Sequence, residues 1–492
     1  MSSSEESYSG KVAVGAAMMV ATRFSVRLLG LVSVTILARL LTPEDFGIFG
    51  TAALVLAFFF MVKEIGFGEA VIKTEDISRD DLDTLWTMRL ILGSATAIAL
   101  FVLVEPIAAF LKEPRVVDVL RLMAIIPIID SLYSPASSLM LKEFKYKQDF
   151  ILKSVDKFVR VIAVIILALT LKSYWALVFG SILASVFGVA ISHVARPYLP
   201  RLTLVNRNKF GKFTLWLYFR SLARYVATSA DEVVVRATEN SAFFGIYHVA
   251  RDLSRILITE IISPVGEALL PALVRFSGQT ERFASATRDI VGIYFIVGIA
   301  VAFGIVATSN EIVLILLGSQ WEHTATFLAI VAIGTACNSM GDINQSIFIA
   351  KNVPRYGAMF WTVRAASYFV LCLVAAMLWG PVGVVVAFSS VSILVLIAEL
   401  VLVFRLVPSD RSWLVLILRP AIAGTLMLLG LDFTFAEVNL PLWALAIAKV
   451  ALGSMVYVAA LLGIWVLLGR NRGPEYSLIA RLPSKVQSIL LP

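Results

Sequence analysis

The chain of 492 residues has few charged side chains, and this shortage decides its broad class. Asp, Glu, Lys and Arg make up 15% of the residues, whereas they make up about a quarter of an average soluble protein. Hydrophobic residues account for 59%, which is more than the interior of a soluble domain holds. The composition excludes a soluble globular protein and predicts an all-α polytopic membrane protein.

The residues and motifs that mark enzymes and metal sites are scarce or missing. Only two cysteines and three histidines occur, without a His/Cys cluster, so no metal site is expected. The sequence contains no GxxxxGK[ST] loop, no GxSxG elbow and no HExxH motif. The acid-rich stretch 73–83 is short and is expected to be a solvated loop. These absences favour a transporter without a cofactor over a membrane enzyme.

Long apolar stretches dominate what is present. A helix that crosses the roughly 30 Å hydrocarbon core needs about 20 mostly apolar residues, and this rule predicts about fourteen spans. The expected spans are 12–38, 46–65, 88–110, 120–141, 151–171, 175–195, 213–235, 243–270, 290–307, 324–350, 356–379, 382–407, 413–431 and 442–468.

Lysine and arginine are concentrated in alternate loops, which predicts the orientation in the membrane. The loops around 142–153, 196–212 and 275–288 and the tail from 470 are rich in basic residues, whereas the intervening loops have few. We therefore expect both termini to be cytoplasmic. The formal charge of +8 reflects this bias and is no sign of nucleic-acid binding.

The sequence repeats itself once. Phe-Gly-Ile-Phe at 46–49 returns as Phe-Gly-Ile-Tyr at 244–247, and Gly-Glu-Ala at 68–70 returns at 266–268, both 198 residues later (46 to 244, 68 to 266). Six predicted helices separate the copies, so both copies enter the membrane in the same sense and form parallel six-helix bundles. The expected division is a first bundle at 1–195, a linker at 196–212, a second bundle at 213–407, and two extra helices with a tail at 408–492.

Arginines inside the predicted helices mark a candidate binding site. Such residues are costly in lipid and are expected to face a partner or a hydrated cavity. A guanidinium group offers a fork of donors that fits a phosphate. Pairs four residues apart share one face of the first helix and one face of the seventh, and a further pair lies on the eighth. The predicted substrate-binding residues, lining a central cavity, are Arg23, Arg27, Arg220, Arg224, Arg251 and Arg255.

Acidic residues and a histidine near these arginines allow two interpretations. They neutralise the arginines and hold or gate the bundles, or they couple transport to the movement of H+ or Na+. Asp252 and Arg255, three residues apart, are typical of the first interpretation. The candidates for coupling or gating are Asp130, Asp231, Glu232, His248 and Asp252.

Four stretches resemble a known family. Residues 37–49 (LARLLTPEDFGIF), 135–147 (PASSLMLKEFKYK), 231–247 and 316–321 (LLGSQW) are similar to polysaccharide transporters. These are the O-antigen and exopolysaccharide repeat-unit flippases of the multidrug/oligosaccharidyl-lipid/polysaccharide exporter superfamily. The resemblance implies fourteen helices, alternating access and a bacterial inner-membrane location. Its implied cargo is an undecaprenyl-diphosphate-linked oligosaccharide.

The resemblance also implies a functional partnership with a polysaccharide polymerase and a chain-length regulator, and a monomer suffices for this architecture. The energy for directional movement is expected from an ion gradient or from consumption of the product outside. Two other cargoes stay open on the same fold: a peptidoglycan lipid precursor, and drugs exchanged for ions by a multidrug antiporter. An antiporter is expected to have acidic and aromatic cavity residues rather than paired arginines.

Overall fold

The computed structural model of the chain describes residues 2–63, 71, 74, 76–143, 145–276, 279–407, 413–438, 440–469 and 473–479. Every regular element over these ranges is a helix, which confirms the predicted all-α class. The chain forms two compact units, Met1–His248 and Val249–Pro492, and the boundary between them falls inside α11 (Ser241–Arg275). The predicted division into bundles at 196–212 stays a prediction.

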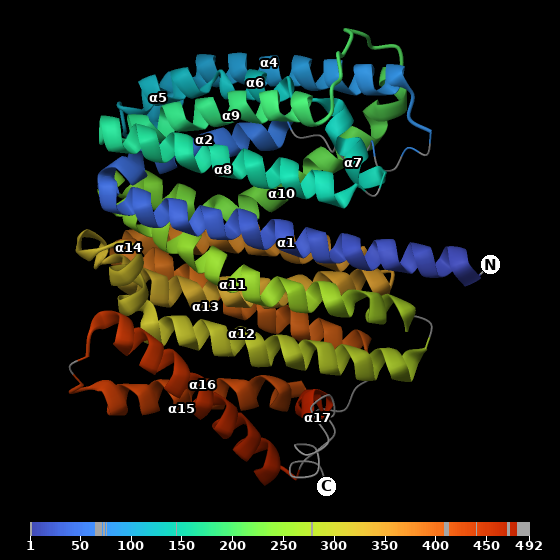
Figure 1. The fold of residues 1–492 in the computed structure, drawn as a ribbon. Coiled ribbons are helices and arrows are strands. Elements are labelled where there is room, and N and C mark those ends of the chain that lie inside the picture. Colours follow the sequence, from blue (N-terminus) through green and yellow to red (C-terminus); the bar gives the residue numbers. More distant parts are fainter. Residues whose placement is uncertain are drawn as a thin grey trace. The chain divides into compact units, whose positions relative to one another are not determined.

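The described part of the first unit contains nine α-helices, one 3-10 helix and the beginning of α11 (Figure 1). In it α8 packs against α1 and α9, while α2 packs against α4, α5 and α10. The elements are α1 (Ser2–Leu40), α2 (Pro43–Lys63), α4 (Arg79–Phe110), α5 (Val116–Met123), α6 (Ile126–Ser131), the 3-10 helix η1 (Pro135–Ser138), α7 (Leu139–Lys142), α8 (Tyr146–Leu171), α9 (Trp175–Ala195) and α10 (Arg207–Thr238).

The predicted continuous span at 120–141 is wrong. The structure divides this stretch into the end of α5, then α6, η1 and α7. Pro127 lies in the first turn of α6, and Pro135 begins η1. Proline has no backbone N–H to donate to the preceding turn, so each one ends the helix before it.

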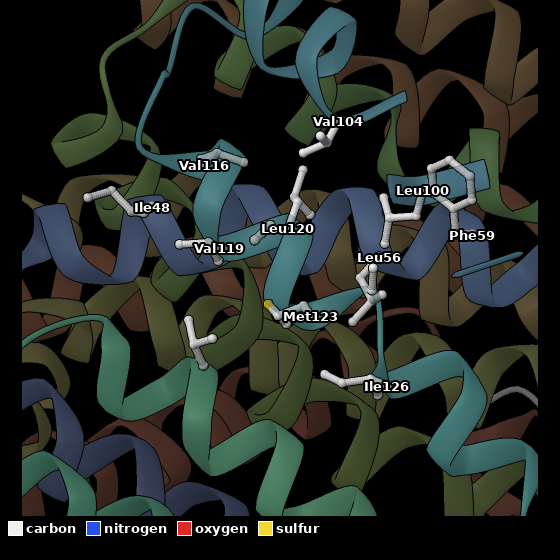
Figure 2. Packing of buried hydrophobic residues seen from close by; sticks show 13 residues of the cluster. Ile48, Leu56, Phe59, Leu100, Val104, Val116, Val119, Leu120, Met123 and Ile126 are labelled. Carbon is white, nitrogen blue, oxygen red and sulfur yellow. The ribbon is translucent and has the colours of Figure 1, made fainter. Parts of the chain in front are cut away.

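One face of α2 is part of the apolar core of the first unit. Side chains at intervals of three or four residues, Ile48, Ala52, Leu56 and Phe59, share this face, which packs against α4, α5 and α9. Figure 2 shows the packing of Leu56 and Phe59 near Leu100. The buried partners on the other helices are Leu100, Val104, Val116, Val119, Leu120, Met123, Ala124, Ile126 and Val178.

The second unit is built around α12, which packs against α13, α15, α16 and α17. Lys449 of α16 forms an ion pair of 2.6 Å with Glu311 of α12, and Arg419 of α15 pairs with Glu475 of α17 at 3.3 Å. These pairs attach the last two long helices to the rest of the unit. The elements are α12 (Thr280–Leu316), the 3-10 helix η2 (Ser319–Trp321), α13 (Thr324–Ala350), α14 (Pro354–Leu406), α15 (Trp413–Phe435), α16 (Leu442–Leu467) and α17 (Pro474–Ile479).

The segment α14 is two helices that fold back on each other at Gly380. This residue has φ 63° and ψ −153°, a conformation that favours glycine, and Pro381 follows it. Tyr368 contacts Ser392 at 2.7 Å across the turn, and farther along Arg364 pairs with Glu399 at 3.1 Å. The separate predicted spans 356–379 and 382–407 are therefore confirmed.

Nine of the described helices are long and apolar enough, by length and composition, to cross a membrane. This count takes α14 as one helix. The long helices α8, α10 and α11 are not among the nine, and each carries several charged residues within its predicted span. The chain is a multi-pass membrane protein, and its charged helices are where a functional site is expected.

Candidate functional site

Basic side chains of α1 and α8 come together inside the first unit. Arg23 and Arg27 are exposed on α1, which packs along α8. A Cβ atom at Gly30 of α1 would lie 3.8 Å from both Cε and Nζ of Lys157 on α8. The half-buried lysine therefore lies against α1, within electrostatic range of Arg160, Arg27 and Asp156.

No described carboxylate forms an ion pair with Lys157, although Asp156 lies within its electrostatic range. The neighbouring acid, Asp156, accepts a hydrogen bond of 2.8 Å from Nε of Arg160 one turn later on the same helix. Within the described part of the chain, Lys157 makes no hydrogen bond and no ion pair. An unpaired ammonium group in a membrane-spanning helix is costly unless it meets an anion or water.

A glycine of α9 makes room for the Arg160–Asp156 pair. A Cβ atom at Gly188 would lie 2.7 Å from Nη2 of Arg160 and 2.8 Å from Oδ1 of Asp156. Tyr133 lies within electrostatic range of both residues, and its ring is 5.9 Å from the guanidinium carbon of Arg89 on α4. We call the basic groups of this region the basic cluster: Arg23, Arg27, Arg89, Lys157 and Arg160. The acids Asp149 and Asp156 lie in the same region.

Two acids predicted to couple or gate transport lie where α10 meets the start of α11. Tyr247 donates a hydrogen bond of 2.5 Å to the buried carboxylate of Asp231. Nδ1 of His248 lies 3.5 Å from Oε2 of Glu232. Both acids thus face residues of α11, and a role in coupling stays a prediction.

The other predicted residues are distributed over several elements. Arg220 and Arg224 lie on α10, and their side chains are outside the described part of the structure. Asp130 is on α6 and is half-buried. The described part of the structure therefore shows none of these three side chains in contact with the basic cluster.

In the second unit, α11 carries Arg251, Asp252 and Arg255. Nη2 of Arg255 lies 2.8 Å from Oδ1 of Asp252, the neutralising pair expected from their spacing. The guanidinium carbon of Arg251 lies 4.4 Å above the ring of Phe388, a cation–π contact.

Sequence reasoning missed three members of the basic cluster: Arg89, Lys157 and Arg160. All three lie inside predicted spans, at 88–110 and 151–171, so a charged residue within an apolar stretch was the available signal. The faces of α4 and α8 that carry these residues become apparent only when the helices are packed.

The acid-rich stretch before α4 is not simply a solvated loop. Asp81 is buried and accepts hydrogen bonds from Asn206 at 2.7 Å and Lys209 at 2.8 Å. Asp83 is also buried and accepts from Tyr198 at 2.8 Å. These acids hold the linker 196–206 against the start of α4, so the expectation of full solvation is wrong for both.

Comparison with known proteins identifies the class. The model of the polysaccharide biosynthesis protein family matches residues 36–326, and the chain belongs to this family. The succinoglycan biosynthesis transport protein ExoT of Rhizobium meliloti (strain 1021) is 24% identical over 451 residues, 88% of each chain. The lipopolysaccharide biosynthesis protein WzxC of Escherichia coli (strain K12) is 20% identical over 74% of this chain and 75% of its own.

Among solved structures, the lipid II flippase MurJ in an inward closed conformation matches with a TM-score of 0.75 at 15% identity. The match covers 92% of this chain and 99% of the flippase, and at this identity it shows the fold. The chain is therefore a polytopic helical transporter of the polysaccharide biosynthesis family, and not an enzyme. The family resemblance predicted from the sequence is confirmed.

Proposed function

We propose that the protein moves an undecaprenyl-diphosphate-linked oligosaccharide repeat unit across the bacterial cytoplasmic membrane, for surface polysaccharide or exopolysaccharide synthesis. The basic cluster carries this proposal, and Lys157 is its central observation. Lys157 forms no ion pair with a described carboxylate, and its neighbour Asp156 is shared with Arg160, so the cluster can accept a further anion. A diphosphate supplies two adjacent anionic groups, and arginine forks match their oxygens.

The membrane position of the cluster suits such a cargo. Lys157 lies eleven residues into α8 (146 to 157), so it is about 17 Å from the start of that helix at about 1.5 Å per residue. A diphosphate held there would leave the isoprenoid tail in lipid. Transport then requires alternating access, with both termini cytoplasmic as the distribution of Lys and Arg predicts.

The relatives support this cargo class. One is named for succinoglycan transport and another for lipopolysaccharide biosynthesis, both of which concern bacterial polysaccharides. A polymerase and a chain-length regulator are the proposed functional partners. The energy that makes transport directional comes either from an ion gradient or from consumption of the transported repeat unit outside the membrane.

A peptidoglycan lipid precursor is the second candidate, because it presents the same diphosphate and the fold matches a lipid II flippase. A multidrug antiporter fits less well, since a cationic drug would be repelled by the basic cluster.

Deleting the gene and analysing the lipid-linked intermediates tests the proposal. We expect loss of a surface polymer and accumulation of its complete diphosphate-linked repeat unit on the cytoplasmic side. Normal polymer together with increased sensitivity to cationic drugs would contradict it. Accumulation of the peptidoglycan precursor would select the second candidate.

A further inference from the structure

The second face of α2 differs from the apolar face that packs in the core. Gly47, Gly50, Thr51 and Leu54 share this face, and it meets α10 and the start of α11. The contacts here include close backbone approaches, the rings of Phe244 and His248 next to Gly50, and hydrogen bonds. The hydroxyl of Tyr225 on α10, for example, donates to the carbonyl of Leu54 at 2.7 Å.

Two glycines, one from each copy of the repeat, make a reciprocal contact. A Cβ atom at Gly47 would overlap the carbonyl oxygen of Ser241, and a Cβ atom at Gly245 would overlap the carbonyl oxygen of Pro43. The two contacts are equivalent, because Gly47 and Pro43 become Gly245 and Ser241 when 198 is added to each number. A contact in which i meets j and j meets i is the mark of a two-fold relation. Only glycine permits this approach of the two helix starts.

A buried arginine joins the same elements beside the glycines. Arg236 of α10 is 2% exposed, and its Nε donates to the hydroxyl of Thr51 on α2 at 2.7 Å. Its Nη1 donates to the carbonyl of Glu239 at 2.8 Å, and its Nη2 lies 3.5 Å from a carboxylate oxygen of Glu113. A single guanidinium thus connects α10 to α2 and to the loop that follows α4.

The carboxylate of Glu113 completes the cluster. Arg115 donates to it at 2.8 Å, and the hydroxyl of Ser241 at the start of α11 donates to its other oxygen. Burial alone would raise the pKa of Glu113. The hydrogen bonds from Arg115 and Ser241 and the charge of Arg236 outweigh this effect and hold the pKa below its ordinary value. The carboxylate is therefore charged at neutral pH and the cluster is intact there.

We propose that these contacts form the outer gate of the transporter, and that α2 separates from α10 and α11 when cargo leaves. The gate comprises Gly47, Gly50 and Thr51 of α2, Arg236 of α10, Ser241 and Gly245 of α11, and Glu113. The predicted orientation places it at the outer side, where the loops at 41–42 and 239–240 have no basic residue and the loop at 111–115 carries Lys112 and Arg115. This inference rests on the proposed transport function and adds the point at which the protein opens.

The two faces of α2 explain why the protein separates here. Parting the apolar face would expose buried hydrocarbon, at about 25 cal/mol for each Å². Parting the gate also exposes the buried ring of Phe244, but its hydrogen bonds and ion pairs can largely be replaced by water. The gate lies between the two copies of the repeat, where a transporter of this architecture has to move.

A reversible cross-link tests the gate. In the Glu113→Cys/Ser241→Cys variant, a short bifunctional methanethiosulfonate should join the two thiols and stop export of polymer, and a reducing agent should restore it. The native Cys337 and Cys372 are both buried, which keeps background labelling low. Each single-cysteine variant, treated in the same way, is the control. Undiminished export after complete cross-linking would overturn the proposal.

A second measurement needs no knowledge of the cargo. The Ser241→Cys thiol is expected to react slowly with a membrane-impermeant maleimide, because Ser241 is 3% exposed. Arg236→Gln should raise this rate about tenfold or more, the least expected for losing a hydrogen bond to a charged group. Gly47→Ala should also raise it, because the added Cβ atom would overlap the carbonyl oxygen of Ser241. Gly463→Ala on α16, where a Cβ atom meets nothing within 4 Å, is the matched control. Unchanged labelling in both gate variants would refute the gate. Faster labelling, together with no effect of gene deletion on lipid-linked glycans, would refute the proposed cargo but would still support the proposed gate.

Discussion

Replacing Lys157 with methionine should weaken binding of a lipid diphosphate without weakening the fold. A hydrogen bond to a charged group contributes about 1.5–3 kcal/mol, which corresponds to about a 10- to 150-fold increase in Kd. Lys157 makes no hydrogen bond or ion pair with a described residue, and its neighbour Asp156 stays paired with Arg160, so its removal leaves no carboxylate stranded. The melting temperature is therefore expected to stay the same or to rise, because an unpaired charge has been removed from the membrane interior.

The assay is binding of undecaprenyl diphosphate to the purified protein in detergent, paired with a melting curve for each variant. Lys153→Met is the matched control, one turn earlier on α8, because Lys153 is paired with Asp149 at 2.7 Å. Its affinity for the diphosphate should equal that of the wild type. Equal affinity of the Lys157→Met variant and the wild type would refute the role given to the basic cluster. A large fall in melting temperature for the Lys157→Met variant would refute the claim that the lysine is unpartnered.

Three further predictions concern stability. Arg364→Leu should lower the melting temperature, since losing one member of a buried ion pair costs about 3–5 kcal/mol; a second change, Glu399→Leu, should restore most of it. Gly380→Ala should destabilise by about 1–3 kcal/mol, because its φ of 63° is unfavourable for alanine; an unchanged denaturation curve would contradict the tight turn. Hydrogen bonds from Arg196 lower the pKa of Glu143 to about 2 from 4.5, so the folded state gains stability from this carboxylate above pH 4.5 and loses it as the pH falls towards 2. The difference in melting temperature between wild type and Glu143→Gln should therefore narrow over that interval.

Much of the fold could be predicted because burial in a membrane leaves a strong compositional signal. The length of most apolar stretches predicts the spans. The sequence also predicts two helices, rather than one, on either side of Gly380 and Pro381. The break at 120–141 was not foreseen, since an apolar stretch of the right length hides what Pro127 and Pro135 do to the backbone. Hydropathy reports how apolar a segment is, and not whether its backbone is continuous.

The candidate site was less predictable, because a helix face is visible in the sequence but its neighbour is not. Arg23 and Arg27 were recognised from their spacing. The proximity of Lys157 to α1 depends on how α8 packs there and on the space left by Gly30. The repeat was likewise visible in the sequence, whereas the reciprocal contact of Gly47 and Gly245 required the packed helices.

The most direct test of the central claim is translocation of a purified undecaprenyl-diphosphate-linked repeat unit in proteoliposomes. A glycan-modifying enzyme added outside the vesicles would measure the repeat unit that reaches the outer leaflet. We expect vesicles with the wild-type protein to present the substrate to the enzyme much faster than empty vesicles, and vesicles with the Lys157→Met variant to resemble the empty ones. Equal rates in all three preparations would contradict transport of a diphosphate-linked glycan by the basic cluster.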